Sequence, residues 1–183
     1  MATTTPVRER TRREIVGQAM VLFQSKGYSA TSLQDIATAA GCSKATVLYH
    51  FNGKPAVLSA VLEPSRAALA ELNAAAAELP PAEAQELAIT RFVELAVEFR
   101  GVVHVLQDVL PTIDEMPEFT DLIAAGLRLT EFLAGSDDPL ERALAEFAIN
   151  GLLGECRHSG ERTDAELHAL CDTALRRILR LPD

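Results

Sequence analysis

The chain has 183 residues, of which 48% are hydrophobic, and it contains no Trp. This length suits one or two small domains with a buried core. No apolar run reaches the roughly 18 residues that a membrane span needs, and the first 13 residues lack the apolar segment of a secretory signal. The chain has three cysteines, an odd number without a tight framework. We therefore expect a cytoplasmic protein with reduced thiols.

Charge is distributed unevenly along the chain, whose net charge is −9. Residues 1–54 hold seven Lys and Arg against three Asp and Glu, a net charge of +4, whereas the remainder holds ten against 23, a net charge of −13. A basic head on an acidic body favours DNA at one end of the molecule and repels it from the other. The excess of +4 is modest, and alone it also fits a charged arm that serves solubility.

An amphipathic helix is predicted from Arg12 to Lys26. Residues 1–7 are expected to form a disordered lead-in. The arginines that follow this lead-in either contact phosphate or are solvated. Gly27 then provides the C-terminal cap. The apolar stripe of this helix consists of Ile15, Val16, Ala19, Leu22 and Phe23.

Two short helices with a tight turn are predicted between Thr31 and Lys54. Thr31 is the N-cap candidate of the first, and Gly41 supplies the positive φ that ends it. Ser43 is the N-cap candidate of the second. Small residues at Ala37 and Ala40 allow two helices to cross closely, as in a helix-turn-helix. The second helix and the residue beyond it present the donors and cations Lys44, Thr46, Tyr49, His50 and Lys54.

The remainder of the sequence also reads as helical, because it is rich in Ala, Leu and Glu. A long helix after Pro55 contains Pro64, which is expected to kink it. Gly101 is expected to separate the preceding helix from a short apolar helix. Pro111 and Pro117 are expected to bound a loop. The predicted helices of this region cover residues 55–79, 81–99, 102–110, 118–134, 139–158 and 163–181, the last opened by a capping box from Thr163 to Glu166.

The residues of the head follow a characteristic order, which includes Phe23, Gly27-Tyr28, Thr31, Ile36-Ala37, Ala40-Gly41, Ser43, Thr46, His50-Phe51 and Lys54. In this order the chain resembles the N-terminal domain of the TetR family over about its first third. The resemblance implies an all-α protein of about nine helices: an N-terminal three-helix helix-turn-helix DNA-binding domain, residues 1–54, and a C-terminal helical bundle for ligand binding and dimerisation, residues 55–183. Cys42, Ala45 and Leu48 depart from the usual Val, Gly and aromatic residue. The aromatic usually touches a phosphate, so that contact falls to Tyr49 or is missing.

DNA-binding residues follow from the resemblance and from the helix itself. Ser43 is expected to cap the recognition helix. We expect contacts with base edges from Lys44, Ala45 and Thr46, with the Ala45 methyl meeting a thymine methyl. The expected phosphate contacts come from Thr31, Ser32, Tyr49, His50 and Lys54.

The resemblance also implies a small hydrophobic effector in the body of the protein and a homodimer. Ordinary core packing is the alternative for every residue of the proposed pocket, and a monomer core is the alternative for the last two helices. The pocket candidates are Phe92, Leu95, Phe99, Val103, His104, Leu106, Met116, Phe119, Ile123, Leu127, Phe147 and Asn150. The interface candidates are Leu140, Leu144, Phe147, Gly151, Leu167, Leu170, Ala174, Leu175 and Ile178.

Chemistry beyond binding is not expected. The sequence has no glycine-rich phosphate loop, no nucleophile elbow and no His-Glu-x-x-His motif, so we do not predict an enzyme. Cys156, His158, His168 and Cys171 are metal-ligand types, but a hairpin at 1.5 Å per residue separates the two cysteines by about 9 Å along its axis. This distance is too long for one zinc in one chain; a site shared across a dimer stays open, and we predict no metal or cofactor.

The sequence therefore predicts a DNA-binding transcriptional regulator, a repressor that a ligand releases from a palindromic operator. A helical ligand-binding or protein-interaction module that no longer reads specific DNA is the alternative.

Overall fold

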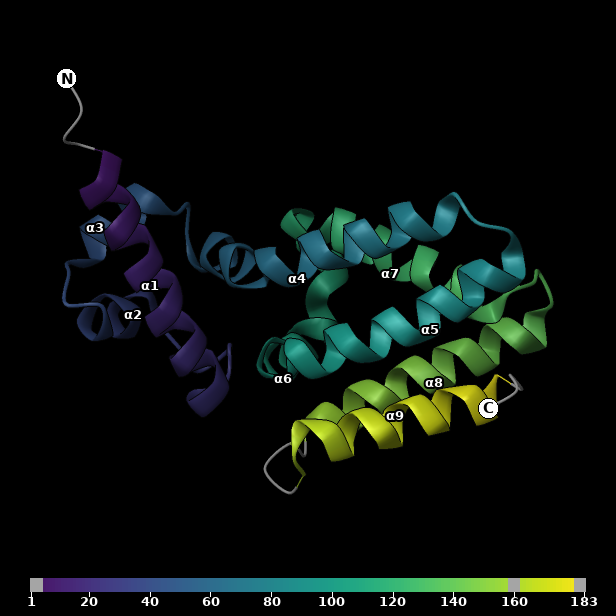
Figure 1. Cartoon of the computed structure of the whole chain (residues 1–183). Coiled ribbons are helices and arrows are strands. Elements are labelled where there is room, and N and C mark those ends of the chain that lie inside the picture. The colour runs from purple at the N-terminus through teal and green to yellow at the C-terminus, as the bar shows by residue number, and fades with distance from the viewer. Residues whose placement is uncertain (1–4, 158–161, 180–183) are drawn as a thin grey trace. The chain divides into compact units, whose positions relative to one another are not determined.

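The structure is a computed structural model that describes residues 5–157 and 162–179. The described residues form nine α-helices and two short 3-10 helices without a strand, which confirms the predicted all-α class (Figure 1). The elements are α1 (Thr5–Lys26), α2 (Leu33–Ala39), α3 (Lys44–His50), α4 (Lys54–Ala77), α5 (Pro81–Glu98), α6 (Arg100–Val109), η1 (Leu110–Glu115), η2 (Pro117–Phe119), α7 (Thr120–Ala134), α8 (Pro139–Arg157) and α9 (Asp164–Ile178).

The chain divides into two compact units. The first consists of Met1–Pro64 and Val105–Phe119, and the second of Ser65–His104 and Thr120–Asp183. The division between residues 1–54 and 55–183 concerns function and stays a prediction. The compact units themselves divide within α4, at Pro64, and the first unit also includes the end of α6 and both 3-10 helices.

The first unit is built around the apolar stripe of α1. Ile15, Ala19 and Phe23 are fully buried there, together with Ile36 of α2 and Val47 of α3. Each of the larger side chains in this set, those of Ile, Phe and Val, contributes about 1.5–3 kcal/mol relative to exposure. This core holds α2 and α3 against α1, so that the remaining faces of these short helices are free for contacts with a partner.

Most local signals in the head are confirmed. Gly27 and Gly41 have φ angles of 84° and 63°, in the left-handed region that glycine adopts without steric cost. Ser43 caps α3. The predicted N-cap of α2 is wrong by one residue: Ser32 takes this position, because its side chain forms a reciprocal capping box with Asp35.

Other predicted boundaries are corrected. The lead-in over residues 1–7 is wrong for residues 5–7, because α1 already begins at Thr5 and carries Pro6 in its first turn, where proline is tolerated; residues 1–4 lie outside the described part. Gly101 does not break the helix as predicted, since α5 already ends at Glu98 with Phe99 as its C-cap, and Gly101 lies in the first turn of α6. The predicted loop from Pro111 to Pro117 is largely 3-10 helix.

The second unit packs α5 against α7, α8 and α9, and α8 and α9 lie side by side (Figure 1). Its core includes Ile89, Val93, Leu133 and Leu167, each at most 1% exposed. The predicted capping box from Thr163 to Glu166 is confirmed at the start of α9.

A cross-link between helices reinforces this core. Arg176 of α9 donates two hydrogen bonds to Glu86 of α5, at 2.9 and 2.6 Å, and one to each oxygen of Asp172. Paired with these donors, the Glu86 carboxyl has a lowered pKa. A bidentate pair between Arg and carboxylate fixes the relative position of the two helices as well as contributing energy.

No helix within residues 5–157 and 162–179 is both long enough and apolar enough to cross a membrane.

Candidate DNA-binding surface

The first turn of α3 is organised by Ser43. Its hydroxyl oxygen accepts a hydrogen bond from the Thr46 backbone N–H at 3.0 Å and lies 2.9 Å from the Thr46 hydroxyl. A Ser N-cap of this kind contributes about 1 kcal/mol to helix stability. Ser43 therefore fixes where α3 begins and which way the Thr46 side chain points.

One face of α3 is buried and the other is free. Val47 is completely buried, whereas Lys44 and Ala45 are exposed and Tyr49 is 70% exposed. Among the described residues, no carboxylate lies within ion-pair distance of the Lys44 ammonium. Lys44, Ala45 and Tyr49 are thus available to a partner, while Thr46 and His50 are half-buried.

Lys54 is engaged inside the head. Its ammonium donates to the backbone carbonyls of Tyr28, Ser29 and Thr31, at 2.9, 3.4 and 3.0 Å, and lies 4.2 Å from the centre of the Tyr28 ring. Burial lowers the pKa of this lysine. The three protons of an ammonium match three acceptors, so Lys54 ties the first residue of α4 to the segment between α1 and α2. The phosphate contact predicted for Lys54 would require these bonds to be given up.

Two further phosphate candidates also donate hydrogen bonds within the head. Thr31 is 2% exposed, and its hydroxyl donates to the Gly27 carbonyl at 2.8 Å. The Ser32 backbone N–H and hydroxyl both donate to Asp35, at 2.9 and 2.7 Å, which lowers the pKa of that carboxyl. The burial of the Thr31 side chain contradicts its predicted phosphate contact, because Thr31 closes the segment after α1. Ser32 caps α2 and is exposed, so its predicted phosphate contact stays a prediction.

The structure adds two cations beside α3 that the predicted set does not include. The Arg8 guanidinium lies 5.6 Å from the centre of the Tyr49 ring, and that of Arg12 lies 5.1 Å from the centre of the Phe51 ring. Both arginines are exposed, so each is free to meet a phosphate while stacked on an aromatic ring. The arginine run in the sequence was the signal, but only the packing of α1 against α3 selects these two residues.

The predicted effector pocket is not a single enclosed site in the structure. Leu106, Met116 and Phe119 belong to the first compact unit, and the other nine candidates belong to the second. Phe92, Leu95 and Val103 are buried in the core, and Phe99 packs against it. Leu127 and Phe147 are 60% and 69% exposed, and Asn150 is exposed, which contradicts their assignment to the wall of an enclosed pocket. His104 and Ile123 are half-buried.

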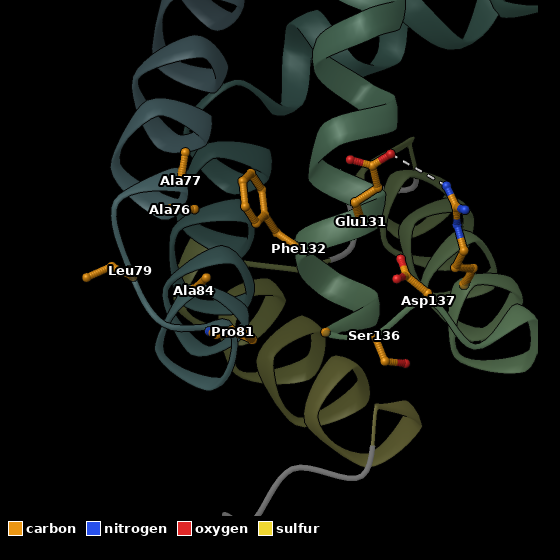
Figure 2. Close-up of a pocket in the computed structure, with 11 residues that line it drawn as sticks. Ala76, Ala77, Leu79, Pro81, Ala84, Glu131, Phe132, Ser136 and Asp137 are labelled. Carbon is orange, nitrogen blue, oxygen red and sulfur yellow. Dashed lines mark ion pairs between the residues drawn. The ribbon is translucent and has the colours of Figure 1, made fainter.

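A groove of about 460 Å³ lies instead at one end of the second unit, where α4 and α7 end and α5 and α8 begin (Figure 2). Phe132 and several alanines supply its apolar lining, and a 3.6 Å ion pair between Glu131 and Arg142 lies at its edge. None of the twelve predicted pocket residues lines this groove. Its residues are Ala76, Ala77, Leu79, Pro81, Ala84, Glu131, Phe132, Gly135, Ser136, Asp137 and Arg142.

The predicted interface residues fall into three groups by exposure. Leu167 and Leu175 are 1% and 2% exposed and pack in the core of their own chain, so their assignment to a dimer contact is corrected. Leu144 and Ile178 are half-buried against that core, and Ala174 is also half-buried. The remaining residues leave apolar surface uncovered on α8 and α9: Leu140 at 58%, Phe147 at 69%, Leu170 at 39%, and the exposed Gly151.

The cysteines and histidines do not form a metal site in the described part of the chain, where no cluster of three or more ligand-type side chains occurs. Cys156 and Cys171 are buried free thiols of the second unit. Burial raises the pKa of both, to about 12 for Cys156, whose Sγ lies 3.6 Å from the Ala96 carbonyl oxygen. His158 lies outside the described residues.

Comparison with known proteins shows which protein family this helix-turn-helix resembles. The family model described as bacterial regulatory proteins, tetR family, matches residues 15–61, which run from the middle of α1 into α4 and include the whole helix-turn-helix. Over this segment, the head of the chain is similar to the TetR family. The family consists of transcriptional regulators, which are generally not enzymes.

The curated relatives match the chain mainly through the head. The HTH-type transcriptional regulator SrpR of Pseudomonas putida is 44% identical over 54 residues, which cover 30% of this chain and 25% of SrpR. The HTH-type transcriptional regulator AcrR of Shigella flexneri is 38% identical over 65 residues, 36% of this chain and 30% of AcrR. The matched segment thus spans less than a third of either relative.

The likeness in fold extends further. The crystal structure of a transcriptional regulator of the TerR/AcrR family from Aquifex aeolicus VF5 matches with a TM-score of 0.67 and 25% identity, covering 92% of this chain and 99% of that one. The second unit therefore shares its architecture with such regulators.

Proposed function

We propose that this chain is a cytoplasmic, homodimeric transcriptional regulator of the TetR family that binds a palindromic DNA operator, and that it acts as a repressor released by a small hydrophobic effector. The observation that carries the proposal is the free face of α3. This capped helix is held by a buried core, and it presents an unpaired lysine and a tyrosine in a head of net positive charge. A helix of this width fits the major groove, whose base edges carry the sequence information.

Roles follow from the position of each side chain. The first turn of α3, with Lys44 and Ala45, faces base edges, and Tyr49 donates its hydroxyl to a phosphate beside the groove. Arg8 and Arg12, stacked on Tyr49 and Phe51, add charge beside the same helix. Phosphate contacts set the register of the protein on the duplex, and base contacts select the sequence.

The dimer is supported by the apolar surface of the second unit. Phe147 and Leu140 leave more than half of their surface in water, and Gly151 on the same helix allows close approach of another helix. An isologous contact of this surface with its copy would bury it and would create the two-fold symmetry that a palindrome requires.

Release by an effector requires a ligand that binds one arrangement of the dimer more tightly than the other. The apolar lining of the groove, supplied by Phe132 and several alanines, favours a hydrophobic molecule. The alternative, a helical interaction module that no longer reads DNA, remains relevant because Leu48 cannot donate a hydrogen bond to a phosphate.

The experiment is selection of bound fragments from genomic DNA with purified protein, repeated with the double variant K44A/Y49F. The regulator recovers a palindromic sequence, and the variant loses affinity for it while keeping its helical content. L127E, at an exposed position of α7, is the matched control and keeps the affinity. If the dimeric, folded wild type recovers no preferred sequence, the interaction module replaces the proposal.

A further inference from the structure

The exposed face of α3 has an apolar centre. At about 100° per residue, the four exposed residues fall in the order Lys44, Leu48, Ala45 and Tyr49 across an arc of about 140°. Val47, the buried anchor of the helix, lies outside this arc. The two polar side chains are therefore at the edges of the free face, and Leu48 and Ala45 are in its middle.

Leu48 is not part of the core of the head. It is 49% exposed, whereas its neighbour Val47 is completely buried. Leu48 is thus the largest apolar group on the part of α3 that points away from α1 and α2. It has no donor or acceptor for a phosphate or a base edge.

The chemistry of the major groove limits what such a side chain can meet. Adenine, guanine and cytosine present only hydrogen-bonding groups there, whereas thymine adds a C5-methyl. Leucine placed over a polar base edge would take that edge out of water without replacing its hydrogen bonds, which is costly. Placed over a thymine methyl, it removes apolar surface from water on both sides.

We propose that Leu48 is a specificity-determining residue that reads the C5-methyl of one thymine in each operator half-site. The inference rests on the proposed function, because it names a feature of the DNA that α3 reads. It also gives the departure at Leu48 a role: the position contributes sequence preference in place of a phosphate contact.

The test removes single methyl groups from the DNA. The operator recovered by selection is synthesised with deoxyuridine in place of one thymine at a time, in both half-sites, which deletes the methyl and keeps the base pairing. One symmetric position is expected to weaken wild-type binding about three- to five-fold per methyl removed, the value of one buried methyl group. At that position, a cytosine in place of thymine weakens binding and 5-methylcytosine recovers part of the loss.

The variant L48A assigns the effect to the side chain. It is expected to bind the thymine and deoxyuridine forms of that position equally, while positions read by other residues keep their wild-type response. V21A, at a 56% exposed apolar position of α1, is the matched control and retains the wild-type profile.

The outcomes separate this inference from the proposed function. An operator that is bound specifically, but with no thymine sensitive to methyl removal or with the same profile in L48A, overturns the role of Leu48 and leaves the regulator intact. Failure to recover any preferred duplex overturns both.

Discussion

Replacement of Lys54 by methionine removes three hydrogen bonds while keeping the length of the side chain. The lost donors serve the carbonyls of Tyr28, Ser29 and Thr31. Hydrogen bonds to a charged group contribute about 1.5–3 kcal/mol, and part of this cost is recovered when water reaches the carbonyls. We expect K54M to lower the free energy of unfolding of the first unit by about 2–3 kcal/mol. Hydrogen exchange of the α2 and α3 amides measures this unit by itself.

Two further variants sharpen this prediction. K54R keeps the charge but offers a planar fork that does not converge on three carbonyls, so it should fall between wild type and K54M. K44M, at an exposed lysine without an ion pair, should stay within about 0.5 kcal/mol of wild type. The salt dependence of operator binding should be equally steep in K54M and wild type. If instead K54M is as stable as wild type and the slope for the dimer becomes shallower by about 1.8, each Lys54 contacts a phosphate and our assignment is wrong.

Three other predictions concern the interface, acid stability and the thiols. F147E should convert the dimer to a folded monomer in light scattering, because it places charge in the proposed contact, whereas L127E should not; dimeric F147E would contradict the assigned surface. The capping box lowers the pKa of Asp35, so the stabilisation by its carboxylate is present above about pH 4 and is lost as the pH falls further. The difference in urea midpoint between wild type and D35N should therefore disappear in acid. If this difference persists in acid, the Asp35 carboxylate is not its cause. Iodoacetamide at neutral pH should modify the half-buried Cys42 before Cys156, because the buried Cys156 thiol has a pKa of about 12. Mass spectrometry of the native protein measures the order of modification. The reverse order would contradict the packing of α8.

Short-range rules were sufficient for much of the fold. The apolar stripe of α1, the positive-φ glycines and the cap at Ser43 each depend on residues within about one helical turn. The structure confirms these three features for this reason. The N-cap of α2 was missed by one position because Thr31 and Ser32 are both good caps, and only the carboxylate of Asp35 selects Ser32. The 3-10 helices η1 and η2 escape prediction because Pro111 and Pro117 resemble helix breakers, whereas each lies in the first turn of a 3-10 helix.

The candidate site was less predictable because it depends on contacts across the sequence. Nothing near Lys54 indicates that three carbonyls more than twenty residues earlier will accept its protons. Periodicity placed Leu167 and Phe147 equally well on an apolar helix face, yet one is buried in its own chain and the other is exposed. That difference follows from which face of each helix meets the core, and only the packed structure supplies it.

The most direct test of the account is a titration of the selected operator with wild-type protein at several salt concentrations, beside the variant R8Q/R12Q. We predict a straight plot of log K against log salt with a steep negative slope, and a slope shallower by about 3.6 in the variant, because two phosphate contacts are lost from each of the two chains on the operator. A binding constant that does not change with salt, or equal slopes for both proteins, would contradict the claim that the basic head around α3 binds DNA.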